Sequence, residues 1–518
     1  MLNDNKTAEI WQEIIDKKDA QIDKYKKRNT ELEHQITWLL DQLKLSKHRQ
    51  FGASSEQSKY DLNQTSLFNE AEQTADLTIP EPDIEEVKSY RRKKSRNAID
   101  RLPPDLDVEI ITHELPENER SCPNCNGQLH VMGRETREEL KLIPARAVIV
   151  RHVRHVYACR DCEKNGTEVP IVKAEMPNPV IKGSFASPEA IAHIASQKFV
   201  MGIPLYRQEQ EWERNGIHLS RQTMSNWLIK ATMWLILIYN RLHELLCEHD
   251  VAHADETTVQ VLHEEGKKAQ SNSYMWLYRT SGDAKHHIVL YEYQPSREGK
   301  HPKEFLKGFN GFLHSDGYER YHELPENITN VGCWAHVQRK FDEALKIIPE
   351  KDRIGTNALH GKHFCQRLFS LERKFSELTP DERFEQRIKL SKPVIDEFFK
   401  WTKSLKVLPK SLIGQAAAYA LNQQKWLENV LLDGRLELSN NRAERSIKPF
   451  VIGRKNWLFS NTPKGAESSA ILYSLIETAK ENGLNPYEYL TAVFRTAPNL
   501  PEGSSVDDLL PWNLCGRI

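Results

Sequence analysis

Three acidic residues occupy positions where a charged side chain calls for an explanation. Asp255 lies in the middle of the stretch VAHADETTVQVL (251–262), whose alternation and β-branched residues predict a strand. Asp316 follows a short apolar strand predicted in GFLHSDGYERY (311–321), and Glu444 lies on a predicted helix. Two strand-borne aspartates and one helix-borne glutamate can hold two magnesium ions for phosphodiester chemistry. Taken singly, an aspartate at a strand end is more often a turn or cap residue, so the triplet is a hypothesis.

Two groups of basic residues accompany these acids. The first group lies on a helix predicted in CWAHVQRKF, and the second group follows Glu444 closely. The two groups consist of His336, Arg339 and Lys340, and of Arg445, Lys448, Arg454 and Lys455. Such side chains can steer a phosphate or neutralise a developing negative charge. The alternative is that they are solvated surface residues or helix-end contacts.

The order of the predicted elements explains how the acids could meet. After the strand of Asp255 come two strand-like stretches, SYMWLYRT and HHIVLYEY, then a helix, the strand of Asp316, a short strand and another helix. This is the order of an RNase H-like fold, a mixed α/β sheet in which the first and fourth strands are neighbours. Asp255 and Asp316 could then share a metal ion. Residues 343–430 are predicted to be a helical insertion that separates Asp316 from Glu444 in the chain.

Four cysteines form two CxxC pairs, which predict a zinc ribbon. The pairs are Cys122 with Cys125 and Cys159 with Cys162. Four thiolates give a closed tetrahedral zinc site, which is structural and not catalytic. The strand-like interval between the pairs is predicted to form a hairpin. The alternative is four buried cysteines without a metal.

The N-terminal part of the chain carries a heptad pattern followed by a charged linker. Positions spaced by three and four over 8–46 are apolar except for Lys18 and Asn29, and no glycine or proline interrupts them, which predicts a parallel dimeric coiled coil. A single amphipathic helix packed on the body is the alternative. The linker is acidic over 70–86 and basic over 88–101, and its basic run either contacts DNA phosphates or forms a solvated tether.

Residues 187–246 have the pattern of a helix-turn-helix. Ser187 and Ser220 are predicted N-caps, and a turn is predicted at Asn215-Gly216. The helix after Ser220 carries polar side chains suited to groove or phosphate contacts. Because short helix-turn-helix patterns are weak signals, plain helical packing is the alternative.

Composition narrows the class of protein. The 518 residues predict several domains, and 28% of the residues are charged with a formal net charge of −1. The longest apolar run, 233–239, is too short to span a bilayer, and no secretory signal is visible at the N-terminus. We therefore expect a cytoplasmic protein without a membrane partner.

Longer stretches of the chain resemble the insertion-sequence-66 family of bacterial DDE transposases over nearly the whole length. The resemblance rests on FGASSE, the CPxC…YACRDCE segment, GIPLYRQEQEWERNGIHLSRQTMSNW, HADET, HSDGYERY, GCWAHVQRKF and SNNRAERSIKPFVIGRKNWLFSNTPKGAESSAILYSLIETAKENGLNPYEYL. It implies that Asp255, Asp316 and Glu444 are the DDE triad of an RNase H-like catalytic domain. Asn126, where such zinc segments often have glycine, and the tail LLPWNLCGRI are small departures.

The expected fold class is therefore multidomain α+β, with a coiled coil, a zinc ribbon, a helical DNA-binding region and an RNase H-like catalytic domain with a helical insertion. The predicted boundaries are 1–50 for the coiled coil, 51–108 for the linker, 109–178 for the zinc ribbon, 180–246 for the helical region, 247–342 with 431–460 for the catalytic domain, 343–430 for the insertion and 461–518 for a C-terminal helical segment.

The resemblance and the residues together imply a function and its cofactors. We expect DNA cleavage and strand transfer with two Mg²⁺ ions, or Mn²⁺ in their place, and a structural Zn²⁺. The expected partners are double-stranded DNA at transposon ends and target, a second copy of the chain or a higher oligomer, and companion transposition proteins. The alternatives are a metal-dependent nuclease that cuts without joining and a catalytically inactive zinc-ribbon regulator that binds DNA.

Overall fold

The computed structural model describes residues 18, 21–26, 28, 32, 36, 147–158 and 171–516. Four of the apolar heptad positions are among them and are helical, with exposed side chains: Ile22, Tyr25, Leu32 and Ile36. Exposed apolar side chains are what a coiled-coil seam presents before it pairs, and the dimer stays a prediction. The linker and the four CxxC cysteines lie outside the described residues.

The chain divides into two compact units, 54–174 and the remainder. In the first unit, β1 (Val156–Ala158) pairs antiparallel with β2 (Ile171–Lys173). The hairpin predicted between the CxxC pairs is therefore wrong for this strand, because the partner of β1 follows the second pair. Residues 147–155 form no strand. The backbone hydrogen bonds of β1 are made with β2, which lies beyond the second CxxC pair. The alternation of residues around β1 therefore did not indicate its partner strand.

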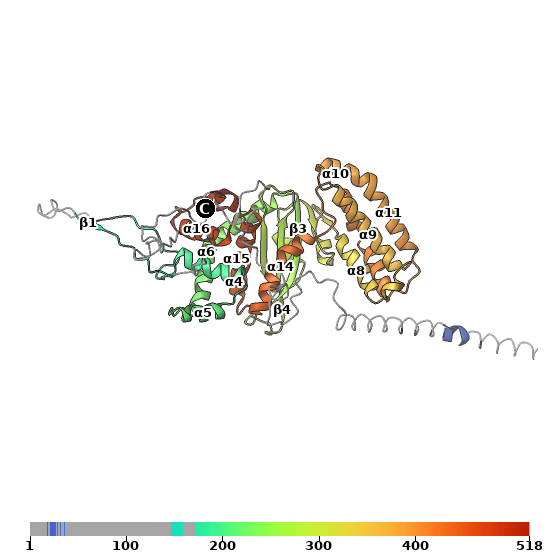
Figure 1. Ribbon diagram of the computed structural model, residues 1–518, viewed down its shortest axis with the longest axis horizontal. Helices are drawn as coiled ribbons and strands as arrows, with labels where there is room; N and C mark the ends of the chain where they lie inside the picture. The colour runs from blue at the N-terminus through green and yellow to red at the C-terminus, as the bar shows by residue number, and fades with distance from the viewer. Residues whose placement is uncertain are drawn as a thin grey trace, which may run out of the picture. The chain divides into compact units, whose positions relative to one another are not determined.

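A five-stranded mixed sheet forms the centre of the larger unit (Figure 1). Its strands are β3 (Val251–Gln260), β4 (Asn272–Thr280), β5 (Val289–Gln294), β6 (Gly311–His314) and β7 (Ile328–Val331), in the order β5-β4-β3-β6-β7. The first three form the predicted antiparallel meander, and β6 is parallel to both β3 and β7. The predicted mixed sheet and the neighbouring first and fourth strands are confirmed.

Helices surround this sheet in two groups. The first group is α4 (Pro188–Phe199), α5 (Leu205–Arg214), α6 (Arg221–Cys247), α7 (Lys300–Phe305), α14 (Asn441–Trp457), α15 (Pro463–Glu481), α16 (Pro486–Thr496) and α17 (Pro511–Leu514). The second group is α8 (Trp334–Lys346), α9 (Asn357–Lys374), α10 (Pro380–Gln386), α11 (Lys392–Ser404), α12 (Leu412–Asn422) and α13 (Gln424–Glu428). Ser187 and Ser220 cap α4 and α6 as predicted.

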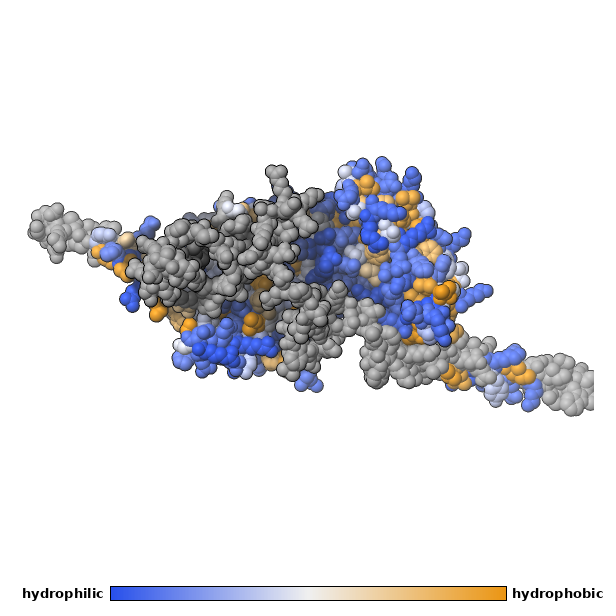
Figure 2. Space-filling view, in the orientation of Figure 1, coloured by the Kyte–Doolittle hydropathy of each residue, from blue (hydrophilic) through white to orange (hydrophobic). Residues whose placement is uncertain are grey.

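Two hydrophobic cores correspond to these two groups. The larger core joins the sheet to α4, α6, α15 and α16, and a second core joins α8, α9, α11 and α12 to β7. The surface of the second group is mainly hydrophilic, with apolar residues scattered between charged ones (Figure 2). None of the described helices is long and apolar enough to cross a membrane.

Helices α5 and α6 are joined by a turn at Gly216, where φ is +76°. The predicted helix–turn–helix order is therefore present. However, α6 runs for 27 residues and buries a side chain in nearly every turn, among them Trp227, Leu235 and Leu246. Most of α6 is therefore used for helical packing. Contacts of its first turn with a DNA groove stay a prediction.

Helix α15 closes one edge of the sheet. The outer edge of β5 offers unpaired backbone groups, and hydroxyls of α15 satisfy them. Thr478 Oγ1 accepts from the Val289 N–H and donates to the Val289 carbonyl, both at 3.0 Å, and Ser474 Oγ accepts from the Tyr291 N–H at 2.7 Å. Since unpaired buried backbone groups are costly, these hydroxyls fix the helix against the strand.

Gly311 opens β6, and its lack of a side chain allows the chain to pass close to the backbone of Asp250, just before β3. Its φ is +151°, and a Cβ built there would lie 2.2 Å from the Asp250 carbonyl oxygen. We expect Gly311→Ala to lower the free energy of unfolding by about 2–4 kcal/mol, through backbone strain and overpacking. Gly308→Ala is the matched control, since Gly308 also has positive φ but a Cβ there meets nothing within 4 Å. Urea denaturation followed by circular dichroism measures both variants, and equal losses would contradict the close-approach argument.

Candidate active site

The sheet register places Asp255 and Asp316 at matching positions of neighbouring strands. In the parallel pair β3–β6, His253 lies opposite His314. Asp255 follows His253 by two residues on the central strand, and Asp316 follows His314 by two residues just past the end of β6. Side chains two apart on a strand share a face, so the register brings both carboxylates to the same end of the β3–β6 pair.

Glu444 reaches this end from the first turn of α14. Asn440 occupies the N-cap position of α14, but its side chain makes no capping hydrogen bond. Instead, Asn440 Nδ2 donates to the Ala254 carbonyl at 2.8 Å, and its Oδ1 accepts from His253 Nδ1 at 3.1 Å. An asparagine directly before a helix would be expected to cap it, but here the amide instead binds the helix to the strand of Asp255.

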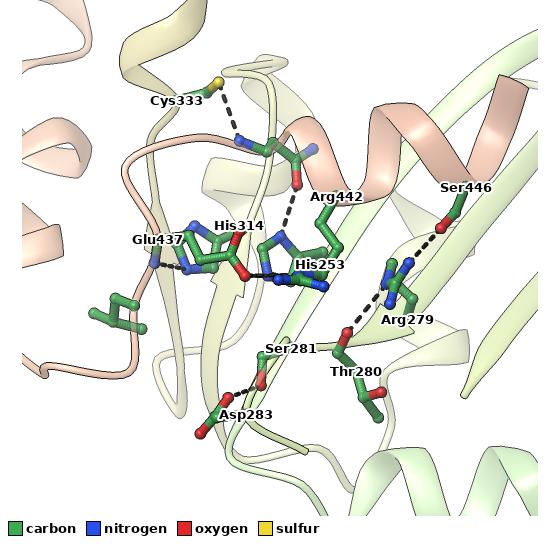
Figure 3. A network of polar contacts seen from close by, with 12 residues as sticks. His253, Arg279, Thr280, Ser281, Asp283, His314, Cys333, Glu437, Arg442 and Ser446 are labelled. Carbon is green, nitrogen blue, oxygen red and sulfur yellow. Dashed lines mark hydrogen bonds and ion pairs between the residues drawn. The ribbon is translucent and has the colours of Figure 1, made fainter. Parts of the chain in front are cut away.

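A buried polar network lies beneath the acids (Figure 3). The rings of His253 and His314 are stacked, with centroids 4.4 Å apart and planes 13° apart. The Glu437 N–H donates to His314 Nε2 at 3.2 Å, and the Asn440 N–H donates to Cys333 Sγ at 3.2 Å. Burial lowers the pKa of His253 to about 3 and that of His314 well below its ordinary value, so both rings are neutral. The stack therefore joins the two strands without adding charge.

Electrostatics single out Asp255 within the site. Its pKa is raised well above the ordinary value, first by burial and then by the charges of Glu256, Asp316 and Glu444. Asp316 and Glu444 are therefore both close enough to Asp255 to disfavour its ionised form. Within the described residues Asp255 forms no ion pair, and its Oδ1 accepts only the Glu256 N–H, at 2.8 Å. A cation placed among these acids would relieve the repulsion.

Glu256, the next residue on β3, is a fourth acid that sequence reasoning missed. Unlike Asp255, it has an ion-pair partner: Arg297 Nε donates to Glu256 Oε1 at 2.8 Å, and Tyr321 Oη donates to Oε2 at 2.7 Å. The Arg297 guanidinium also lies 3.7 Å from the centroid of the Tyr318 ring. Since neighbouring residues on a strand face opposite sides, Glu256 supports the site from behind Asp255.

The loop that carries Asp316 is held by its own backbone and by α12. The Tyr318 N–H donates to Asp316 Oδ1 at 2.9 Å, and Tyr419 Oη donates to the Asp316 carbonyl at 3.0 Å. Gly317 has φ +90°, and a Cβ there would lie 3.0 Å from the side chain of Gln423. The helices between Asp316 and Glu444 in the chain therefore buttress the second acid.

Two of the three basic residues predicted on α8 contact Glu444. Arg339 Nη2 lies 3.2 Å from Glu444 Oε2, and His336 Nδ1 lies 3.8 Å from Glu444 Oε1. Arg339 also bonds to His336 Nε2 at 3.2 Å. The third residue, Lys340, lies 3.8 Å from Glu343 and is exposed. The structure thus groups His336 and Arg339 with the acids, and Lys340 lies beside them on the surface of the helix.

The basic residues predicted on α14 fall into two sets. Arg445, Lys448 and Lys455 are exposed and form no ion pair within the described part of the chain. Arg454 is half-buried and donates to the hydroxyls of Thr257 and Thr258, at 3.3 and 3.2 Å. The first set is available to a ligand, whereas Arg454 joins the end of α14 to β3.

A second group of potential metal ligands overlaps the site. Ligand atoms of Cys333, His336 and Glu444 all lie within 4.8 Å of one another. Burial raises the pKa of the Cys333 thiol to about 11, and Arg339 already neutralises Glu444. A protonated thiol beside a guanidinium is a poor cation site, so the carboxylate cluster is the better candidate.

The sequence contained a signal for the histidine stack. Both acidic strands carry the same triplet, His-Ala-Asp at 253–255 and His-Ser-Asp at 314–316. A repeat of His-x-Asp in two neighbouring parallel strands indicates matched histidines as well as matched aspartates. Asn440 and Arg297 had no comparable signal, because their partners lie far away in the chain.

Comparison with known proteins assigns the class of this chain. The profile described as "Transposase IS66 family" matches residues 183–468, and "IS66 C-terminal element" matches 474–512. In the N-terminal part, "zinc-finger binding domain of transposase IS66" matches 119–163 and "Transposase C of IS166 homeodomain" matches 38–111. These matches indicate a transposase with a zinc-finger domain.

The chain belongs to the IS66 family of transposases, as the length of the first match shows. Relatives from Sinorhizobium fredii are similar over most of their length. The uncharacterised protein y4jD is 31% identical over 89% of this chain and 91% of its own, and the uncharacterised protein y4hP is 29% identical over 82% and 78%. The zinc-finger match, which spans the four CxxC cysteines, indicates a structural zinc.

Because the pKa of Asp255 is raised, we expect replacement of this residue by a neutral one to stabilise the fold in a pH-dependent way. A carboxyl whose folded-state pKa exceeds its unfolded value takes up a proton on folding, so its ionised form destabilises the fold above that pKa. We expect Asp255→Asn to raise the free energy of unfolding in EDTA at about pH 8 and to lose this advantage towards about pH 4, where the wild-type carboxyl is protonated. Urea titrations at both pH values measure the difference, and a destabilised variant at the higher pH would contradict the assignment.

The hydrogen bonds of Asn440 predict its contribution to stability. Asn440→Ala leaves the Ala254 carbonyl and His253 Nδ1 without partners in a buried site, which should lower the free energy of unfolding by about 1–3 kcal/mol. Asn441→Ala is the control, since this neighbouring side chain is only partly buried and should change the stability by less than about 0.5 kcal/mol. Equal effects in the two variants would show that the amide of Asn440 does not hold α14.

Proposed function

We propose that the chain is a DDE transposase with an RNase H-like catalytic domain, which cleaves DNA at transposon ends and joins the ends to a target. The proposal assigns Asp255, Asp316 and Glu444 as the catalytic triad. The observation that carries it is geometric: the register of β3 and β6 brings Asp255 and Asp316 to the same end of the strand pair, and Asn440 fixes the first turn of α14, which carries Glu444, to β3. The strand order and the family support the same proposal.

The residues present fit a pair of magnesium ions. Carboxylates are preferred ligands of this hard cation, and Asp255 has no competing ion pair among the described residues. In this proposal Asp255, Asp316 and Glu444 would together hold the ions. When bound, Mg²⁺, or Mn²⁺ in its place, would supply Lewis-acid activation of a water or DNA 3′-hydroxyl and would stabilise the charge on the phosphodiester.

The protein's own residues prepare the site for this chemistry. The Asn440 amide sets the position of the first turn of α14, and therefore of Glu444, relative to Asp255. The Tyr318 N–H and Tyr419 Oη hold the backbone and carboxylate of Asp316. In the metal-free protein Arg339 neutralises Glu444, and after DNA binding it is placed to stabilise a phosphate together with His336.

The exposed cations on α8 and α14 are assigned to DNA. Lys340 on α8 and Arg445, Lys448 and Lys455 on α14 are exposed near the two helices that carry site residues. In this proposal they contact the phosphodiester backbone, and Arg454 positions α14 against β3 for them. The zinc ribbon would add binding to the transposon end, and the N-terminal heptads would bring two copies together.

A strand-transfer assay tests the proposed function. Purified full-length protein is incubated with a precleaved duplex of the terminal sequence flanking its own gene and a supercoiled target plasmid, with Mg²⁺ or EDTA. We expect joined product that requires Mg²⁺ and falls below detection in Asp316→Ala and Glu444→Gln, because each carboxylate is assigned to hold an ion.

Asp250→Asn is the matched control. Asp250 is an exposed carboxylate just before β3 that pairs with Arg435, and its loss should leave joining within about twofold of wild type. Asp255→Asn protein should still bind the duplex, measured by fluorescence anisotropy. Cleavage without joining would favour the nuclease alternative, and activity that persists in Asp316→Ala would refute the triad.

A further inference from the structure

The chain makes an unusual turn directly after α14. Leu458 has φ +66° and ψ −52°, and no other described non-glycine residue has positive φ. The Phe459 N–H donates to the Trp457 carbonyl at 2.8 Å across it, which defines a γ-turn with positive φ, a rare and strained conformation. Strain of this kind persists only where the surroundings impose it, and it is concentrated at functional sites.

Both sides of this turn are anchored. On the helix side, the Leu458 N–H donates to the Arg454 carbonyl at 2.7 Å, and the Trp457 ring packs edge-on against Phe450 with centroids 5.4 Å apart. On the other side, Ser460 pairs with the end of β3, since its N–H donates to the Gln260 carbonyl at 2.9 Å. The tip is therefore short and fixed between a helix and a strand.

The fixed tip carries two large apolar side chains into solvent. Leu458 is 63% exposed and Phe459 is 42% exposed. Folding alone gives no reason to hold a leucine in a strained conformation and then expose it. An apolar partner that binds to the folded protein would bury these two side chains.

The charge around the tip identifies the partner. From 445 to 466 the chain carries five basic residues and no aspartate or glutamate, and four of the basic residues are exposed: Arg445, Lys448, Lys455 and Lys464. A stripe of unpaired cations beside an apolar tip matches duplex DNA, which presents phosphates outside and apolar base faces inside. An acidic protein surface would satisfy the cations but would offer nothing to the tip.

We propose that Leu458 and Phe459 form an apolar wedge that enters the base stack of the bound DNA end and unstacks it near the site of cleavage. This inference rests on the proposed function. Because a helix rises about 1.5 Å per residue and B-DNA about 3.4 Å per base pair, the wedge lies about 21 Å along α14 from Glu444, the length of about six base pairs. The wedge would thus fix the register of the DNA end relative to the carboxylates.

The test uses 2-aminopurine, whose fluorescence rises when the base is unstacked. Full-length protein, without Mg²⁺, is added to duplexes of the flanking terminal sequence that carry one 2-aminopurine at successive positions on either side of the cleaved bond. We expect a rise of about threefold or more, centred about six base pairs from that bond, and no rise on a scrambled duplex. Fluorescence anisotropy measures binding of the same duplexes.

Three variants separate the wedge from general binding. Leu458→Gly removes the side chain and suits positive φ, so this variant should melt no lower than wild type. Leu458→Gly and Phe459→Ala should each abolish the fluorescence rise while affinity stays within about threefold, because the cost of unstacking and the gain from insertion largely cancel. Ile452→Ala is the control, since Ile452 is also 42% exposed and lies on α14 before the tip. It should keep the full signal.

The outcomes distinguish this inference from the proposed function. Binding without a rise at any position, a rise that survives both tip variants, or a rise lost in Ile452→Ala would overturn the wedge and leave the transposase assignment standing. Failure to bind either duplex would overturn the proposed function and the wedge with it.

Discussion

The side-chain amide of Asn440 is the interaction on which the site depends. It bonds to the backbone and to a histidine of β3, while its backbone N–H bonds to Cys333 at the start of α8. One residue therefore sets the relative positions of a strand, the helix of Glu444 and the helix of Arg339. A carboxylate cluster repels itself, so it persists only where surrounding hydrogen bonds hold each member in place. The neutral histidine stack serves the same purpose, since it joins β3 to β6 without adding a charge.

Local pattern was sufficient to predict much of this fold. Alternation and β-branched residues gave β3 and its neighbours in the correct order, and serine caps located α4 and α6 to the residue. The pairing of β1 was not predictable in this way, because its partner lies beyond the second CxxC pair. Hydrophobic periodicity reports which face of an element is buried, but it does not report which distant segment covers that face.

In the candidate site too, local pattern was sufficient to predict some residues, whereas residues that depend on distant contacts were missed. Asp255, Asp316 and Glu444 could be singled out because an acid in an apolar strand, or beside a run of basic residues, is locally unusual. Glu256 could not be distinguished from a surface acid, since its ion pair with Arg297 is a tertiary contact. From the sequence alone, Asn440 looks like an ordinary N-cap because it directly precedes a helix, and only the folded chain shows that its amide faces β3. Arg454 was grouped with the exposed cations for the same reason, although it is turned towards two threonines.

The hydroxyls of Ser474 and Thr478 have a consequence for assembly. They occupy the outer edge of β5, while at the opposite edge of the sheet Asn429 donates to the carbonyl of Asn330 in β7. Strand edges without partners recruit other chains, and here both edges are engaged internally. Extension of this sheet from one copy of the chain to another is therefore disfavoured. Contacts between copies then have to be made by helices or by the nucleic acid. The central sheet and its acidic residues would therefore have the same structure in a single copy and in an assembly.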